Sequence, residues 1–318
     1  MTVTVVICTR NRPALLERCL TAVARLAPAP AQVLVIDNSE GDKETERAAR
    51  QFSARYVVEP VPGLSRARNR GLAECNTEFV AFLDDDAIPA RGWLGSLIAP
   101  FEDDKVAAST GRVVPPGSDP NLEPAESPRK LTSQDDQWFE RATFGGMGIG
   151  CSMALRRSAC TGWTVFDERL GRGAPFHIGE ETYAFAGLLS RGFAAVYLPD
   201  AIVFHSPHKR YPIEFEARNS FAYWLLLFSA FAAQRVNLLR FIARRVRRKP
   251  LKWPRETQEA GDIVSSNWRV LLKAGVKGAW LFLRTPRDWN FRHRRTTAAN
   301  ARPSPDQECV SRLTTRSQ

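Results

Sequence analysis

The sequence lacks the closely spaced cysteines of a disulfide-rich or zinc-binding protein. Its 6 cysteines are scattered, with no Cys-x-x-Cys pair, and its 4 histidines form no cluster with them. Small secreted domains and zinc sites need such spacing, whereas cytosolic proteins keep isolated thiols reduced. The scatter argues against a disulfide framework and predicts a cytoplasmic setting.

Long apolar segments are also missing. No basic leader or cleavage site precedes the apolar residues 3–8, so we expect no signal peptide. The thirteen uncharged residues Phe221–Ala233 fall short of the roughly 20 that a membrane-spanning helix needs. The segment Gly145–Gly150 does not have the G-x-G-x-x-G spacing of a dinucleotide-binding turn.

Positive charge is plentiful but unevenly spread. The net charge is +11 at pH 7. Residues 235–318 hold 20 lysines and arginines against 6 acidic residues, whereas residues 1–234 hold 25 against 28. This asymmetry predicts a polyanionic partner for the C-terminal segment alone.

Apolar strand patterns alternate with amphipathic helix patterns over the first hundred residues. Such alternation predicts an α/β fold with a Rossmann-like, doubly wound, mostly parallel sheet. Residues 115–137 read as a long loop. Strands are expected at 3–8, 33–36, 56–58, 79–83, 106–114, 151–155, 194–198 and 202–204, and helices at 13–26, 42–52, 65–75, 89–101, 156–160 and 179–190.

Acidic residues follow two of these strands. Asp84, Asp85 and Asp86 end the strand at 79–83, and Asp37 ends the strand at 33–36. In such sheets, ligands bind beyond the carboxyl ends of the strands. Carboxylates there suit Mg²⁺ or Mn²⁺ bridging to substrate phosphates. A solvated turn is the alternative, because aspartate is common in turns.

Several stretches in this order resemble the family 2 glycosyltransferases. The matching residues are 5–13, 35–38, 63–71, 82–86, 166–170, 179–181 and 199–205. The resemblance implies a GT-A fold and an inverting, metal-dependent transferase. Its donor would be a nucleotide sugar, and its acceptor a hydroxyl on a glycan or lipid-linked precursor. It also implies a catalytic domain at 1–215, divided into a nucleotide-binding half (1–114) and an acceptor-side half (138–215).

The resemblance also implies roles for individual residues. Asp86 would bind Mn²⁺ or Mg²⁺, with Asp84 facing the ribose or a metal-bound water and His205 assisting at the metal. Asp37 would accept a hydrogen bond from the nucleobase. The other residues expected beside the nucleotide sugar are Thr9, Arg10, Arg66, Asn69, Arg70 and Asp85.

Glu180 and Glu181 occupy the place of the family's Glu-Asp pair. Inverting transfer needs a carboxylate that takes the proton of the attacking hydroxyl, and a positioned base contributes roughly 10²–10⁴-fold. Glu181 is the expected base, and Glu180 a supporting residue. The alternative is two acidic residues favoured by the helix dipole in a first turn.

Residues 216–288 are predicted to form a basic, amphipathic helical extension, followed by a disordered tail at 289–318. Basic helices with aromatic residues lie well on anionic membranes. We therefore expect a peripheral position on the inner membrane face and no binding of nucleic acid. Packing on the catalytic domain and an oligomer contact remain open alternatives.

Two other functions compete with sugar transfer. A nucleotidyltransferase that makes a sugar nucleotide would need a glycine-rich phosphate loop after the first strand, but residues 9–13 contain no glycine. A non-catalytic membrane-binding protein with a degenerate nucleotide site would not need to keep Asp37, Asp84, Asp86 and Glu181 together.

Overall fold

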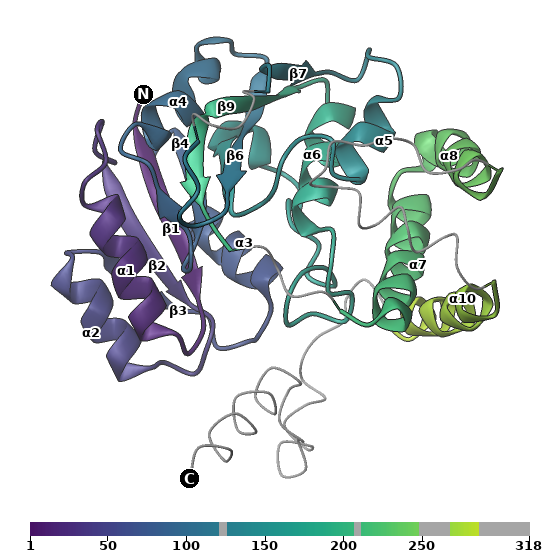
Figure 1. The fold of residues 1–318 in the computed structure, drawn as a ribbon, viewed down its shortest axis with the longest axis horizontal. Coiled ribbons are helices and arrows are strands. Elements are labelled where there is room, and N and C mark those ends of the chain that lie inside the picture. Colours follow the sequence, from purple (N-terminus) through teal and green to yellow (C-terminus); the bar gives the residue numbers. More distant parts are fainter. Residues whose placement is uncertain (121–125, 207–210, 248–267, 286–318) are drawn as a thin grey trace, which may run out of the picture. The chain divides into compact units, whose positions relative to one another are not determined.

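The centre of the fold is a mixed sheet of nine strands (Figure 1). In this computed structural model, residues 1–120, 126–206, 211–247 and 268–285 are described. Residues 1–285 form a single unit, and the expectation for residues 289–318 lies outside the described residues. The strands are β1 (Val3–Thr9), β2 (Gln32–Asp37), β3 (Arg55–Val58), β4 (Phe79–Asp84), β5 (Ile88–Pro89), β6 (Val106–Val114), β7 (Arg129–Leu131), β8 (Ser152–Arg156) and β9 (Ala194–Phe204).

Helices follow most of these strands. They are α1 (Pro13–Val23), α2 (Lys43–Gln51), α3 (Leu64–Glu74), α4 (Trp93–Ile98), α5 (Trp138–Thr143), α6 (Glu180–Ser190), α7 (Ile213–Ala230), α8 (Arg235–Arg247) and α10 (Trp268–Leu283). The described residues also form 3-10 helices at Ala99–Glu102, Arg157–Cys160 and Ala232–Gln234.

The strand order is β3-β2-β1-β4-β8-β6-β9-β5, with β7 paired to β9. Strands β1 to β4 are parallel to one another, and β6 is parallel to β9. Between these two groups, β8 is antiparallel to both neighbours. The expected mostly parallel α/β fold is therefore confirmed. Because β8 runs the other way, it begins at the same edge where β4 ends, with Ser152 opposite Leu83.

Alternation along the buried strands builds a core on each face of the sheet. On β1, Val5 and Ile7 join the cluster under α1, α2 and α4, whereas Val6 and Cys8 join the cluster under α3, α5 and α6. Every residue of β1 is buried. A strand covered on both faces reads as a continuous apolar run, which is why the sequence pattern identified it.

The structure departs from the expected elements at three places. The strands expected at 194–198 and 202–204 form one strand, β9, whose pairing with β6 shifts register between Gly111 and Arg112. The helix expected at 89–101 is shorter, because it follows the two-residue strand β5 and spans only Trp93–Ile98. The expected loop at 115–137 contains β7.

Of the C-terminal helices, α8 lies beside α5, and α10 packs against α7 (Figure 1). The uncharged run Phe221–Ala233 belongs mainly to α7, where Ala222, Tyr223, Leu226 and Leu227 are buried in the core. The boundary expected at residue 215 falls inside this helix. Among the described residues, no single helix is both long and apolar enough to cross a bilayer. One bent pair, Glu214–Ala230 with Ala232–Ala243, has the length and composition together, with a 112° angle at its break.

Candidate active site

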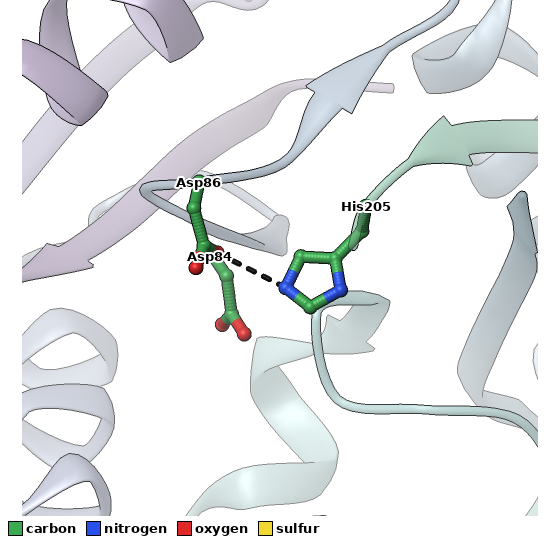
Figure 2. A group of neighbouring side chains, drawn as sticks. All are labelled: Asp84, Asp86 and His205. Atoms are coloured by element: carbon green, nitrogen blue, oxygen red, sulfur yellow. Dashed lines mark hydrogen bonds and ion pairs between the residues drawn. The ribbon is translucent and has the colours of Figure 1, made fainter. Parts of the chain in front are cut away.

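Three side chains that could hold a metal ion meet at the carboxyl edge of the sheet (Figure 2). Asp84 ends β4, Asp86 lies in the following turn, and His205 follows β9. The short strand β5 pairs with the end of β9 through Ile88 and Phe204, which brings His205 to the aspartates. One ligand atom from each of the three residues lies within 4.8 Å of the other two.

Asp86 and His205 influence each other's ionisation. His205 Nε2 lies 3.0 Å from Asp86 Oδ1. Burial opposes the charged form of each group, but their hydrogen bond and opposite charges raise the pKa of His205 and lower the pKa of Asp86 to about 2. Arg12, with Nη1 3.3 Å from Asp86 Oδ2, adds to the lowering. Asp86 is therefore ionised at neutral pH.

Asp85 points into the protein and not toward this group. It is fully buried, accepts a hydrogen bond of 2.6 Å from Thr9 Oγ1 and lies 2.5 Å from Arg12 Nη2. Burial raises the pKa of Asp85 to about 7 against the opposing effects of Arg12 and Thr9. These contacts tie the aspartate turn to the end of β1. They also engage Thr9, which was expected beside the nucleotide.

Asp37 is fully buried at the end of β2. Its Oδ2 accepts hydrogen bonds from the backbone N–H of Asp42 at 2.9 Å and from the hydroxyl of Tyr56 at 2.6 Å. Its Oδ1 has no hydrogen-bond partner in the described part of the chain. A buried acceptor without a partner is costly, so this atom suits an N–H donor from a ligand.

Arg68 connects the metal-binding side of the site to α6. Its side chain is 2% exposed, with Nη2 3.4 Å from Asp84 Oδ1 and Nη1 3.0 Å from Glu180 Oε1. Nη2 also donates to the carbonyl of Gly150 at 3.1 Å. Arg68 was not predicted from the sequence. A usable signal was present, because Gly71 lies one turn after Arg68 on α3. A Cβ at Gly71 would lie 2.6 Å from Val6 Cγ1, so this side of the helix packs closely on the sheet.

The other residues expected beside the nucleotide are less central. Arg10 is exposed, and its side chain has no hydrogen bond or ion pair among the described residues. The remaining three make protein contacts: Arg66 with Glu168 at 2.7 Å, Asn69 with the backbone of Phe166 at 2.8 and 3.2 Å, and Arg70 with Glu74 at 2.8 Å. Their nucleotide-binding roles stay predictions. Arg12, which contacts two of the aspartates, was not anticipated.

Glu180 and Glu181 begin α6 after Gly179, which adopts a left-handed conformation with φ of 85°. Glu180 is held by Arg68, whereas Glu181 takes part in no ion pair among the residues that the structure describes. Burial, followed by the nearby charge of Glu180, raises the pKa of Glu181 above its ordinary value. The side chains of Arg68 and Glu181 both lie close to Gly150. A Cβ at this position would lie 3.0 Å from Arg68 Nη2 and 3.2 Å from Glu181 Cβ, so glycine leaves room for both.

The chemistry of the three grouped side chains fits a divalent cation. Asp84 and Asp86 offer hard oxygen ligands, and His205 offers an imidazole nitrogen, a set that suits Mn²⁺ or Mg²⁺. The aspartate side chains are 24% and 30% exposed, so a ligand can reach them. Three protein ligands leave coordination positions for phosphate oxygens and water.

Comparisons with known proteins agree with this reading. Residues 4–162 match the family model described as Glycosyl transferase family 2. The "Pre-mycofactocin glycosyltransferase" of Mycobacterium tuberculosis is 32% identical over 228 residues, covering 69% of this chain and 45% of that protein. The "Succinoglycan biosynthesis protein ExoM" of Rhizobium meliloti is 28% identical, covering 63% of this chain and 65% of that protein.

Solved structures share the fold at low sequence identity. S. aureus TarS 1-349 in complex with UDP-GlcNAc has a TM-score of 0.55 at 16% identity, covering 93% of this chain and 92% of that chain. The mannosyltransferase PcManGT from Pyrobaculum calidifontis, in complex with GDP-Man and Mn²⁺, has a TM-score of 0.50 at 17% identity, covering 98% and 79%. The chain spans about half the length of the pre-mycofactocin glycosyltransferase.

Proposed function

The chain belongs to family 2 of the glycosyltransferases, and from that premise we propose that it transfers a sugar, with inversion, from a nucleoside-diphosphate sugar to a hydroxyl group. The proposal rests on one observation: two clusters of carboxylate side chains lie close together at one edge of the sheet. Asp84 and Asp86 form one group, Glu180 and Glu181 form the other, and Arg68 contacts both.

The donor would bind across the ends of β2 and β4. The unpartnered Oδ1 of Asp37 would accept from an N–H of the nucleobase. Asp84, Asp86 and His205 would hold Mn²⁺ or Mg²⁺. When bound, the cation would neutralise the charge that develops on the diphosphate leaving group.

Glu181 would act as the general base. The acceptor oxygen attacks the anomeric carbon from the face opposite the diphosphate, and the bond from that carbon to the diphosphate oxygen breaks. The proton of the acceptor hydroxyl passes to Glu181, and the nucleoside diphosphate leaves. Glu180, held at 3.0 Å by Arg68, fixes the first turn of α6 that carries the base.

The acceptor is a glycan or a lipid-linked glycan precursor in this proposal. The name of one relative, the succinoglycan biosynthesis protein, supports a product of that class. The donor in this proposal is a nucleoside-diphosphate sugar.

The test separates donor binding from transfer. Thermal shift is measured with UDP, GDP, dTDP and CDP sugars, each with and without Mn²⁺ or Mg²⁺, because a ligand of the native state raises the melting temperature. We expect one donor class to stabilise the protein, and a divalent cation to increase the effect. Asp86→Asn should lose the part of the shift that depends on the cation.

Transfer is then followed with the donor found. Glu181→Gln should keep the donor-induced shift and lose roughly 10²–10⁴-fold in transfer rate. The matched control is Glu44→Gln, in the first turn of α2, which should leave both unchanged. If none of the nucleotide sugars raised the melting temperature, the proposal would be wrong. Pyrophosphate release from a nucleoside triphosphate and a sugar phosphate would favour the nucleotidyltransferase instead.

A further inference from the structure

An apolar stripe lies exposed along α10. Leu272, Val276, Trp280 and Leu283 are 62%, 66%, 57% and 78% exposed. Single exposed apolar side chains are ordinary, but four on one helix indicate an interaction surface. We call these four residues the α10 stripe.

The stripe is not the face that joins α10 to the rest of the protein. That face holds Ala274, which is 2% exposed, and Gly278. A Cβ at Gly278 would lie 2.7 Å from the carbonyl oxygen of Arg218 in α7, so the two helices approach closely there. The contact fixes the rotation of α10 about its axis and turns the stripe away from α7.

Basic side chains flank the stripe on one side. Successive residues of a helix are rotated by roughly 100°, which places the stripe on one arc of α10. The next arc holds Lys273, Lys277 and Arg284, all exposed, and the buried face follows it. Arg284 lies over the ring of Trp280, 4.5 Å from its centroid. The two lysines lie 4.0 and 3.9 Å from Glu214 in exposed pairs, which contribute little to stability.

We propose that the α10 stripe binds an anionic lipid surface, with its apolar side chains at the acyl boundary and the basic arc at the headgroups. Adjacent apolar and basic faces with a tryptophan are the features of a helix lying in a membrane interface. Charge complementarity supports this occupant. In the described parts of the C-terminal segment, residues 235–247 and 268–285, there are nine lysines and arginines and no acidic residue, and anionic headgroups would neutralise this excess. A second copy of the chain would instead bring two sets of these cations to one interface.

The structure alters the sequence-based expectation in one respect. The run Phe221–Ala233 is not the lipid-facing part, because α7 buries Ala222, Tyr223, Leu226 and Leu227. The inference does not rest on the proposed reaction, since lipid binding can be measured without a donor or acceptor.

The test is cosedimentation of the full chain with vesicles. Phosphatidylcholine vesicles with and without phosphatidylglycerol are compared at low and high salt. We expect partitioning onto the anionic vesicles that is at least about tenfold stronger and that weakens with salt. Equal partitioning onto both vesicles, or none, would overturn the proposal.

Two variants and a control locate the contact. Lys273→Glu with Lys277→Glu should reduce anionic partitioning about tenfold or more. Val276→Ser with Trp280→Ser should reduce it even at low salt, and because both side chains are exposed the melting temperature should not change. The control is Lys43→Glu with Arg47→Glu, an exposed pair at the same spacing on α2, which should bind as wild type does.

The same variants decide against other occupants. Equal losses in the control and in the α10 variants would assign binding to net charge and overturn the role of α10. If sedimentation velocity found a dimer that the serine variants dissolve, while vesicle binding persisted, the stripe would belong to a second copy.

Discussion

Asp84, Asp85 and Asp86 are adjacent in the sequence, but their side chains lie in different environments. Asp84 contacts Arg68, Asp86 contacts His205, and Asp85 is buried against Thr9 and Arg12. Only the first and third offer atoms to the candidate metal site. The difference arises because the turn after β4 places alternate side chains on opposite sides.

The pKa of Glu181 predicts how transfer depends on pH. A general base acts only when deprotonated, so a raised pKa means that activity is lost as pH falls through a range above the ordinary glutamate value of 4.5. Part of the elevation comes from the charge of Glu180. In a profile of kcat against pH, Glu180→Gln should therefore move the rising limb to lower pH. If the rising limb of the kcat profile stayed at the same pH, the result would contradict the assignment of Glu181 as the base.

At this scale, the sequence predicted residues that lie where strands and helices end. Asp37 and Asp84 end strands, Asp86 and His205 lie just after strands, and the ends of parallel strands share an edge. Arg12 and Arg68 were missed because their importance lies in contacts over long sequence separations. Arg68 meets Glu180, 112 residues away, and no local pattern encodes that pairing.

Among the elements, the start of α6 depends on α7. Gly179 has φ of 85°, and a Cβ there would lie 2.6 Å from Cε2 of Tyr223. The Tyr223 hydroxyl lies 2.7 Å from Oγ1 of Thr182, one residue after the proposed base. The C-terminal extension therefore holds the turn that presents Glu181.

Replacing Gly179 tests this support. Gly179→Ala should lose transfer activity at least about tenfold, because the clash displaces the first turn of α6. Gly192→Ala is the control: Gly192 has φ of 87° but no atom within 4 Å of its added Cβ. Each variant carries a backbone strain of about 1–2 kcal/mol, read from urea unfolding. Equal activities in the two variants would argue against a role for the Tyr223 contact.

Elements with strong periodicity were predicted well, and elements defined by distant pairing were not. The expected span of β6 agrees with the structure at 106–114. The strand β7 has only three residues and exists because it pairs with β9. The interruption of the apolar pattern between 198 and 202 predicted a strand end, but β9 continues through it and pairs with β6 after a register shift. Both features depend on pairing with strands that are distant in the sequence, so neighbouring residues do not reveal them.

For the whole molecule, α10 is part of the folded unit and not an appendage. It packs along α7, and Phe282 stacks near Phe176, with ring centroids 6.5 Å apart. Phe176 is fully buried and lies just before Gly179. Removing α10 would therefore expose core surface beside the proposed base.

Two truncations check this dependence by differential scanning fluorimetry. A chain ending at Arg247 should melt about 5 °C or more below the full chain, given roughly 2–4 °C per kcal/mol for domains of this size. A chain ending at Thr285, the last residue of the first unit, should have the same melting temperature as the full chain. An unchanged melting temperature in the shorter chain would mean that α10 adds little to the core.

Arg68 is a shared counter-ion for carboxylates on both sides of the site. Substituting either partner leaves the guanidinium half-neutralised, so damage at Asp84 will also disturb the turn that bears the proposed base. A mutational screen that scores only turnover would report the same defect for Asp84 and Glu180. Their contributions become distinguishable only when ligand affinity is titrated separately from product formation.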